Sequence, residues 1–145
     1  MYRGVGMNLI VYDGLFAICR LDPGGDVPSW SSKSPFLSVT RSSDELSIVC
    51  SQHVIPQTIR CSRNWRLLRI EGVLDLQLTG VLNGLLSPLA VAGVTVFTLS
   101  TFDTDYIMVP EQMLDRVCEV FKAEGHRIVK EKGDNKSDSY LNSKN

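Results

Sequence analysis

The sequence lacks the residue combinations that metal centres and acid–base catalysis require. Its two histidines, His53 and His126, stand far apart, and its four cysteines show no Cys-x-x-Cys spacing. Cys19, Cys50 and Cys118 lie in apolar runs, where a reduced cysteine behaves as a small hydrophobic residue. The sequence therefore predicts no metal site, no catalytic residue and no cofactor, and it favours a reducing compartment, the cytoplasm.

Strong charge of one sign and long hydrophobic runs are also missing. The formal net charge is -1 at pH 7, which gives no general attraction to nucleic acid or acidic membranes. The longest apolar region, residues 81–99, is interrupted by Asn83, Pro88 and Gly93, so it is not a transmembrane span. The N-terminus is too weakly apolar for a secretory signal. We expect neither a nucleic-acid partner nor a membrane partner.

Arginine occupies every third position from Arg60 to Arg69, and Trp65 lies within this stretch. This stretch is a basic nucleic-acid surface, or else a solvated strand face or a dimer edge. The near-neutral net charge and the alternation over residues 65–70 favour the second interpretation. Cys61 stands beside these arginines, and the sequence leaves the exposure of its thiol open.

A short acidic turn between two β-type runs is the centre of the second half. Residues 94–100 and 106–109 are rich in apolar, β-branched and aromatic residues, and the turn from Thr101 to Asp105 separates them. Asp103 and Asp105 in this turn are either ligand-binding carboxylates or solvated turn residues. They do not form an acid–base pair, because no histidine or third carboxylate lies near them in sequence.

Helical patterns lie on both sides of this hairpin. We expect Pro88 to kink the first helix and Gly93 to end it, whereas Pro110 begins the second helix and Gly125 ends it. With strands over residues 65–70 and 126–129, the second half has the ferredoxin-like order β-α-β-β-α-β. The apolar stripe of the first helix consists of Leu78, Val81, Leu82, Leu85, Leu86 and Leu89.

The first half is a shortened version of the same order. A shift of 60 positions aligns Glu45 with Asp105 and Pro28 with Pro88, which indicates two related modules. The turn that ends at Glu45 is either a second ligand site or a plain hairpin turn. The expected elements are strands over 15–21, 36–40 and 46–51, a helical turn over 27–30 and a connector over 52–64.

These patterns predict an α+β protein made of two tandem ferredoxin-like modules. The first module is abbreviated, the antiparallel sheets are packed side by side, and the helices cover one face. Expected boundaries are an N-terminal extension over residues 1–12, an abbreviated module over 13–60, a complete module over 61–129 and a disordered polar tail over 130–145.

The chain resembles the ACT-domain family of amino-acid-sensing modules over residues 13–129, above all its short tandem, arginine-sensor-like and aspartate-kinase-like members. The most specific segment is Leu99-Ser-Thr-Phe-Asp-Thr-Asp-Tyr106. The resemblance implies a ligand site where a strand–helix loop of one module meets a strand of another. The resemblance also rests on residues 35–50, 65–72, 78–82 and 87–90.

By position, the resemblance implies that the ligand contacts the start of the first helix and the turn after the following strand. A helix N-terminus favours a carboxylate, and Asp105 can pair with an α-ammonium group. The implied ligand-binding residues are Leu78, Thr79, Gly80, Thr101, Phe102 and Asp105.

The resemblance predicts a non-catalytic regulatory protein that binds a free amino acid and reports its presence to a regulated protein partner. A ligand that bridges two modules would stabilise one of their arrangements. Exposed sheet edges favour a homodimer. The alternatives are a ligand-free structural or protein-interaction module and the regulatory subunit of an enzyme.

Overall fold

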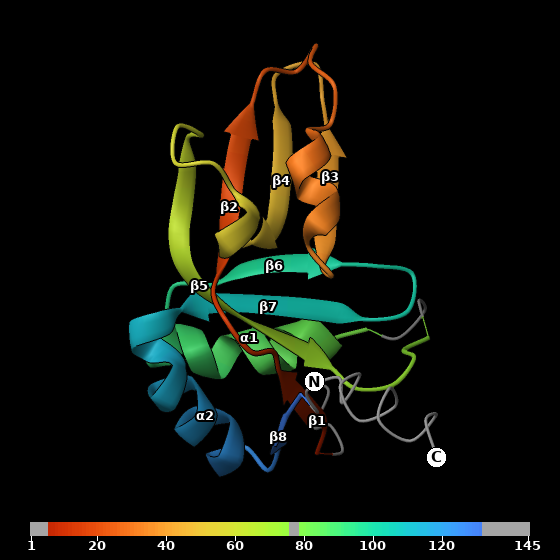
Figure 1. Cartoon of the computed structure of the whole chain (residues 1–145). Coiled ribbons are helices and arrows are strands. Elements are labelled where there is room, and N and C mark those ends of the chain that lie inside the picture. The colour runs from red at the N-terminus through yellow and green to blue at the C-terminus, as the bar shows by residue number, and fades with distance from the viewer. Residues whose placement is uncertain (1–5, 76–78, 132–145) are drawn as a thin grey trace, which may run out of the picture.

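The computed structural model of the chain describes residues 6–75 and 79–131, which form one eight-stranded sheet and two α-helices (Figure 1). The sheet order is β3-β4-β2-β5-β1-β8, and β7 pairs with both β5 and β6. Only β1 and β8 run parallel; the other pairs among the described residues are antiparallel. The strands are β1 (Asn8–Val11), β2 (Phe16–Leu21), β3 (Leu37–Arg41), β4 (Leu46–Ser51), β5 (Cys61–Ile70), β6 (Phe97–Ser100), β7 (Asp105–Pro110) and β8 (Arg127–Lys130).

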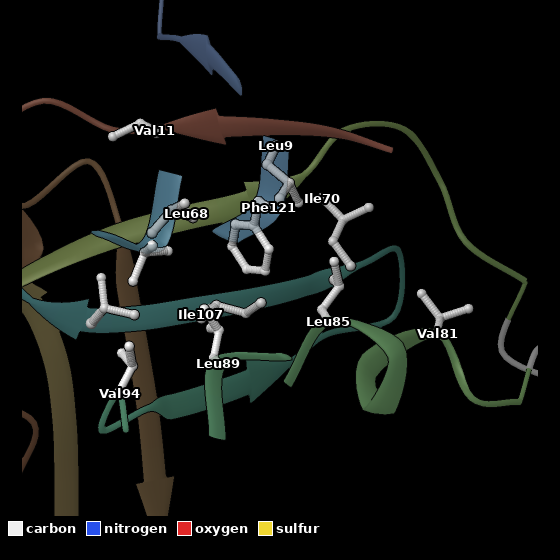
Figure 2. Close-up of a cluster of buried hydrophobic side chains, with 12 residues drawn as sticks. Leu9, Val11, Leu68, Ile70, Val81, Leu85, Leu89, Val94, Ile107 and Phe121 are labelled. Atoms are coloured by element: carbon white, nitrogen blue, oxygen red, sulfur yellow. The ribbon is translucent and has the colours of Figure 1, made fainter. Parts of the chain in front are cut away.

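The two α-helices pack against one face of the sheet in the second half. They are α1 (Val81–Val91) and α2 (Leu114–Ala123). Leu85 and Leu89 of α1 and Phe121 of α2 are buried against strand residues that include Leu9 and Ile107 (Figure 2). The α+β class, the ferredoxin-like order of the second half and the placement of the helices on one face are confirmed.

The strand β1 belongs to the sheet of the second half, although it comes from the N-terminus. It lies between β5 and β8, pairing Leu9 with Ile70 on one side and with Ile128 on the other. Leu9 is completely buried in the helix-covered core. Burial of an apolar side chain drives this docking, which the weak N-terminal pattern did not predict.

The strand β5 connects the two halves and is longer than expected. The connector predicted over residues 52–64 is wrong at its end, because Cys61 and Ser62 already pair with β2. Asn64 has a φ of 68° in the middle of the strand, and the β2–β5 register shifts nearby. The Gln52 side chain holds this bend: its Oε1 accepts the Asn64 amide N–H at 2.7 Å.

The first half has a small core of its own beneath two 3-10 helices. These are η1 (Ser29–Lys33) and η2 (Gln52–Val54), which stand where the complete module has α-helices. Trp30 and Val54 pack onto buried residues of β2 and β4. The predicted helical turn over residues 27–30 is thus present, but it begins two residues later than expected.

A third cluster joins the two halves on the face of the sheet opposite to the α-helices. Phe16 and Val49 from the first half pack with Leu67 and Met108. In Figure 1, β2, β3 and β4 run across the direction of β6 and β7. The cluster contains residues from both groups of strands. The halves therefore share both a strand and a core. Among the described residues, no helix is long and apolar enough to cross a membrane.

Candidate functional site

The β6–β7 turn is held in a defined conformation by two threonines. The Thr101 N–H donates to the Thr104 carbonyl at 2.8 Å, and the Thr101 Oγ1 accepts the Thr104 N–H at 3.3 Å. Thr104 is only 5% exposed, and its Oγ1 donates to the Ile70 carbonyl at 2.8 Å. The turn is therefore anchored to the end of β5.

A cavity of about 210 Å³ lies beside this turn. One wall is the turn itself, and the other comprises the segment after β5 and the first residue of α1. The Leu74 N–H joins the two walls by donating to the Asp103 carbonyl at 2.6 Å. The lining residues are Leu74, Asp75, Val81, Ser100, Thr101, Phe102, Asp103, Thr104 and Asp105.

Three of the residues that the resemblance implied, Thr101, Phe102 and Asp105, line this cavity together. Thr79 and Gly80 are exposed and do not line it, although they directly precede the helix start. Leu78 lies outside the described residues. The structure thus brings the turn and the helix start together, and ligand contact by each residue remains a prediction.

The start of α1 provides a positive electrostatic environment next to the cavity. Gly80 has a φ of 77°, a left-handed conformation that glycine adopts readily. The Gly84 N–H makes the first helical bond, to the Gly80 carbonyl at 2.9 Å. The amide N–H groups of the preceding helical turn have no acceptor within the helix, so this end favours an anionic group.

Carboxylates supply the opposite charge. Asp75, Asp103 and Asp105 line the cavity, and the described residues of its lining include no lysine, arginine or histidine. The Ser100 Oγ donates to the Asp105 Oδ1 at 2.6 Å and orients this carboxylate. Among the described residues, no group of three acidic, histidine or cysteine side chains is arranged to hold a metal ion. The arrangement suits a ligand that carries an ammonium group and a carboxylate.

Five lining residues were not predicted from the sequence: Leu74, Asp75, Val81, Ser100 and Thr104. Ser100 was recognisable, because it pairs directly with Asp105 across the hairpin. Leu74 and Asp75 follow a turn and belong to no helix or strand, so no periodicity marked them.

A second cavity, of about 410 Å³, lies where the two halves meet. Phe36 from the first half contacts Tyr106 of β7 with ring centroids 4.8 Å apart, and both rings line the cavity. Burial, together with the neighbouring Tyr12, raises the pKa of the Tyr106 hydroxyl. Asp13, His53 and Glu131 form part of the rim. No sequence pattern predicted this cavity.

The turn that ends at Glu45 behaves as a hairpin turn. The Ser42 Oγ accepts the N–H groups of Asp44 and Glu45, each at 3.2 Å. Glu45 forms an exposed ion pair with Arg20 at 3.9 Å. Local interactions therefore hold this turn.

Comparison with protein families gives two adjacent matches. The model of the ACT domain matches residues 60–123, and a model described as an N-terminal domain matches residues 14–58. No curated protein matches the chain.

Among solved structures, the chain is similar to a protein from Agobacterium tumefaciens with 32% sequence identity and a TM-score of 0.83. The match covers 90% of this chain and 97% of that one. A protein of unknown function from Vibrio cholerae, described as a possible transport protein, is 15% identical with a TM-score of 0.66; 82% and 90% of the chains are covered. The regulatory subunit of aspartate kinase from Thermus flavus shares the fold at 10% identity and a TM-score of 0.55, over 83% and 97% of the chains.

Proposed function

Because this chain belongs to the ACT-domain family, we propose that it is a non-catalytic regulatory protein that binds a free amino acid in the cavity beside the β6–β7 turn. The observation that carries the proposal is the pairing of opposite charges around this cavity. The start of α1 suits the ligand's carboxylate, and the Asp105 carboxylate suits its α-ammonium group. The regulatory subunit of aspartate kinase, which shares the fold, supports a regulatory role.

A ligand in this position would touch both walls of the cavity. One wall continues into α1 and the other into β6 and β7, so the bound ligand would stabilise one arrangement of the helix relative to the hairpin. A partner protein that recognises this arrangement would then respond to the amino acid. We place this activity in a reducing compartment such as the cytoplasm, in keeping with the four free cysteines.

The exposed edge of β3 supports the proposal of a homodimer. Leu37 and Val39 are about two-fifths exposed there, at 39% and 40%. Among the described strands, β3 pairs only with β4, so its outer edge is open to a strand of a second copy. Light scattering from the full chain tests this pairing, because a homodimer has twice the mass of a single chain.

The first test is a thermal-shift screen of the full chain against the twenty amino acids. A ligand present at a hundred times its dissociation constant adds about 2.7 kcal/mol to the stability of the protein. We expect one amino acid, or a chemically related group, to raise the melting temperature by about 5–11 °C. Isothermal titration calorimetry of the responding amino acid then gives the affinity.

Asp105→Asn tests the site itself. The substitution keeps the size of the side chain and removes the charge that would pair with the α-ammonium group, so we expect binding to weaken at least about tenfold. Asp44→Asn removes the same charge from an exposed turn in the first half and should leave binding unchanged. Equal binding by Asp105→Asn and the wild type would place the ligand elsewhere. A screen without any shift would favour a ligand-free interaction module.

A further inference from the structure

Three of the four cysteines gather on one face of the first half, away from the candidate ligand site. Cys19 of β2 lies directly opposite Cys61 of β5, and Cys50 of β4 packs in the same buried cluster. Cys61 is partly buried and packs against this cluster. Cys118 is on α2 and takes no part in this cluster.

The register makes Cys19 and Cys61 the pair that a disulfide can bridge. The next residues along, Arg20 and Arg60, form a hydrogen-bonded pair, because the Arg20 N–H donates to the Arg60 carbonyl at 3.0 Å. Pairs alternate along an antiparallel ladder, so Cys19 and Cys61 form a non-hydrogen-bonded pair, in which the Cα atoms are about 4.5 Å apart. Disulfides bridge Cα atoms about 4.4 to 6.8 Å apart.

Cys50 is less well placed for a bond to Cys19. Its direct partner on β2 is Ala17, two residues away from Cys19, so the two cysteines are diagonal neighbours. Diagonal positions hold their Cα atoms about 7–8 Å apart, beyond the usual disulfide range. The exposed fractions also differ, because Cys19 and Cys50 are buried, at 1% and 0%, whereas Cys61 is only half-buried. An oxidant therefore reaches Cys61 first.

We propose that Cys61 and Cys19 are an oxidation site, at which a hydroperoxide converts the two thiols into a reversible disulfide. The Cys61 thiolate attacks the peroxide oxygen, which gives a sulfenic acid and releases the alcohol, or water from hydrogen peroxide. The Cys19 thiolate then attacks the Cys61 sulfur, forms the S–S bond and expels hydroxide, which takes up a proton and leaves as water. Two thiols and one hydroperoxide thus give one disulfide, one alcohol and one water.

The disulfide would covalently link β2 of the first half to the shared strand β5. Residues 20–60, which lie between the two cysteines, include β3, β4 and the 3-10 helices η1 and η2. A crosslink that closes this loop restricts the unfolded chain, so we expect the oxidised protein to melt about 5–10 °C above the reduced protein.

The rate of the reaction should depend strongly on pH. Burial raises the pKa of the Cys61 thiol, and the neighbouring Cys19 adds to this effect, whereas Arg63 opposes it. The thiolate is the reactive form. The rate of disulfide formation should therefore keep rising at pH values at which an ordinary exposed cysteine has already ionised.

Trypsin separates the four cysteines, which makes the test direct. After treatment of the full chain with hydrogen peroxide and blocking of the remaining thiols, Cys19 lies in peptide 4–20, Cys50 in 42–60, Cys61 in 61–63 and Cys118 in 117–122. We expect a linked species of peptides 4–20 and 61–63, lighter by two hydrogen atoms than their sum. Dithiothreitol should remove it.

Two variants provide the controls. Cys118→Ser should keep the crosslink, because its thiol lies outside the cluster, and Cys61→Ser should abolish both the crosslink and the rise in melting temperature. Cys61→Ala repeats the second test with an apolar residue if the serine variant does not fold. A link between peptides 4–20 and 42–60, a link between two chains, or oxidation of Cys61 without a crosslink would each overturn the proposal.

Discussion

Single side chains connect the candidate site to the rest of the fold. Thr104 is a turn residue by sequence, yet its hydroxyl reaches the carbonyl of Ile70 at the end of β5. This bond fixes the turn that presents Thr101, Phe102 and Asp105 to the cavity. The role of Thr104 could not be predicted from the sequence, because the bond joins residues that are distant along the chain.

His126 provides a residue-scale prediction about pH. Its Nδ1 accepts the Met7 N–H at 3.1 Å, and its ring packs edge-on against Phe121. Burial lowers the pKa of His126 below its usual value of 6.5, and the nearby Glu124 opposes this effect. The folded state therefore favours the neutral ring, so the stabilisation is present above about pH 6.5 and is lost as the pH falls through the lower folded-state pKa.

We expect the free energy of unfolding of the wild type to decrease more steeply between pH 7 and pH 5 than that of His126→Gln. Urea denaturation at several pH values measures this difference. His53→Gln, which changes an exposed histidine on η2, should follow the wild type. Parallel curves for the wild type and His126→Gln would show that the Met7 contact does not depend on a neutral ring.

At the scale of elements, strong local signals predicted most of the structure. The β6–β7 hairpin, α2 and β8 appear near their expected positions because alternation, helical spacing and the Pro110 and Gly125 signals agree. The early start of β5 was missed because Ser62, Arg63 and Asn64 are polar, and only pairing with β2 makes them a strand. The strand β1 was missed because its stability comes from distant partners.

The end of α1 gives an element-scale prediction. Gly93 has a φ of 75°. Its N–H donates to the Ala90 carbonyl at 3.0 Å at the end of the helix. Gly93→Ala should cost about 1 kcal/mol, because a side chain disfavours this left-handed conformation although there is space for it. Gly24→Ala also enters open space, without a positive φ, and should be neutral or slightly stabilising. Urea denaturation compares the two variants.

At the scale of the whole molecule, the shared strand and the joint core predict that both halves unfold together. Trp30 reports on the first half, because it packs onto that core, and Trp65→Phe leaves it as the only tryptophan. In this background, Leu9→Ala removes a buried side chain from the helix-covered core of the second half. We expect the free energy of unfolding to fall by about 2–5 kcal/mol. Trp30 fluorescence and circular dichroism should report the same decrease.

Val73→Ala changes an apolar side chain that is 77% exposed and should leave both signals near the parent values. If Leu9→Ala left the Trp30 transition unchanged while circular dichroism shifted, the two halves would unfold independently. That result would favour the predicted boundary between residues 60 and 61 as a true domain boundary.

The position of β1 also determines when this sheet can be completed during synthesis. One edge of β1 pairs with β8, residues 127–130, which leave the ribosome more than a hundred residues after β1. Until then the nascent chain carries an open strand edge beside Leu9 and Val11, a surface on which other chains can aggregate. A strand that is made late therefore covers one that is made early, and the sheet is completed only after β8 has been synthesised.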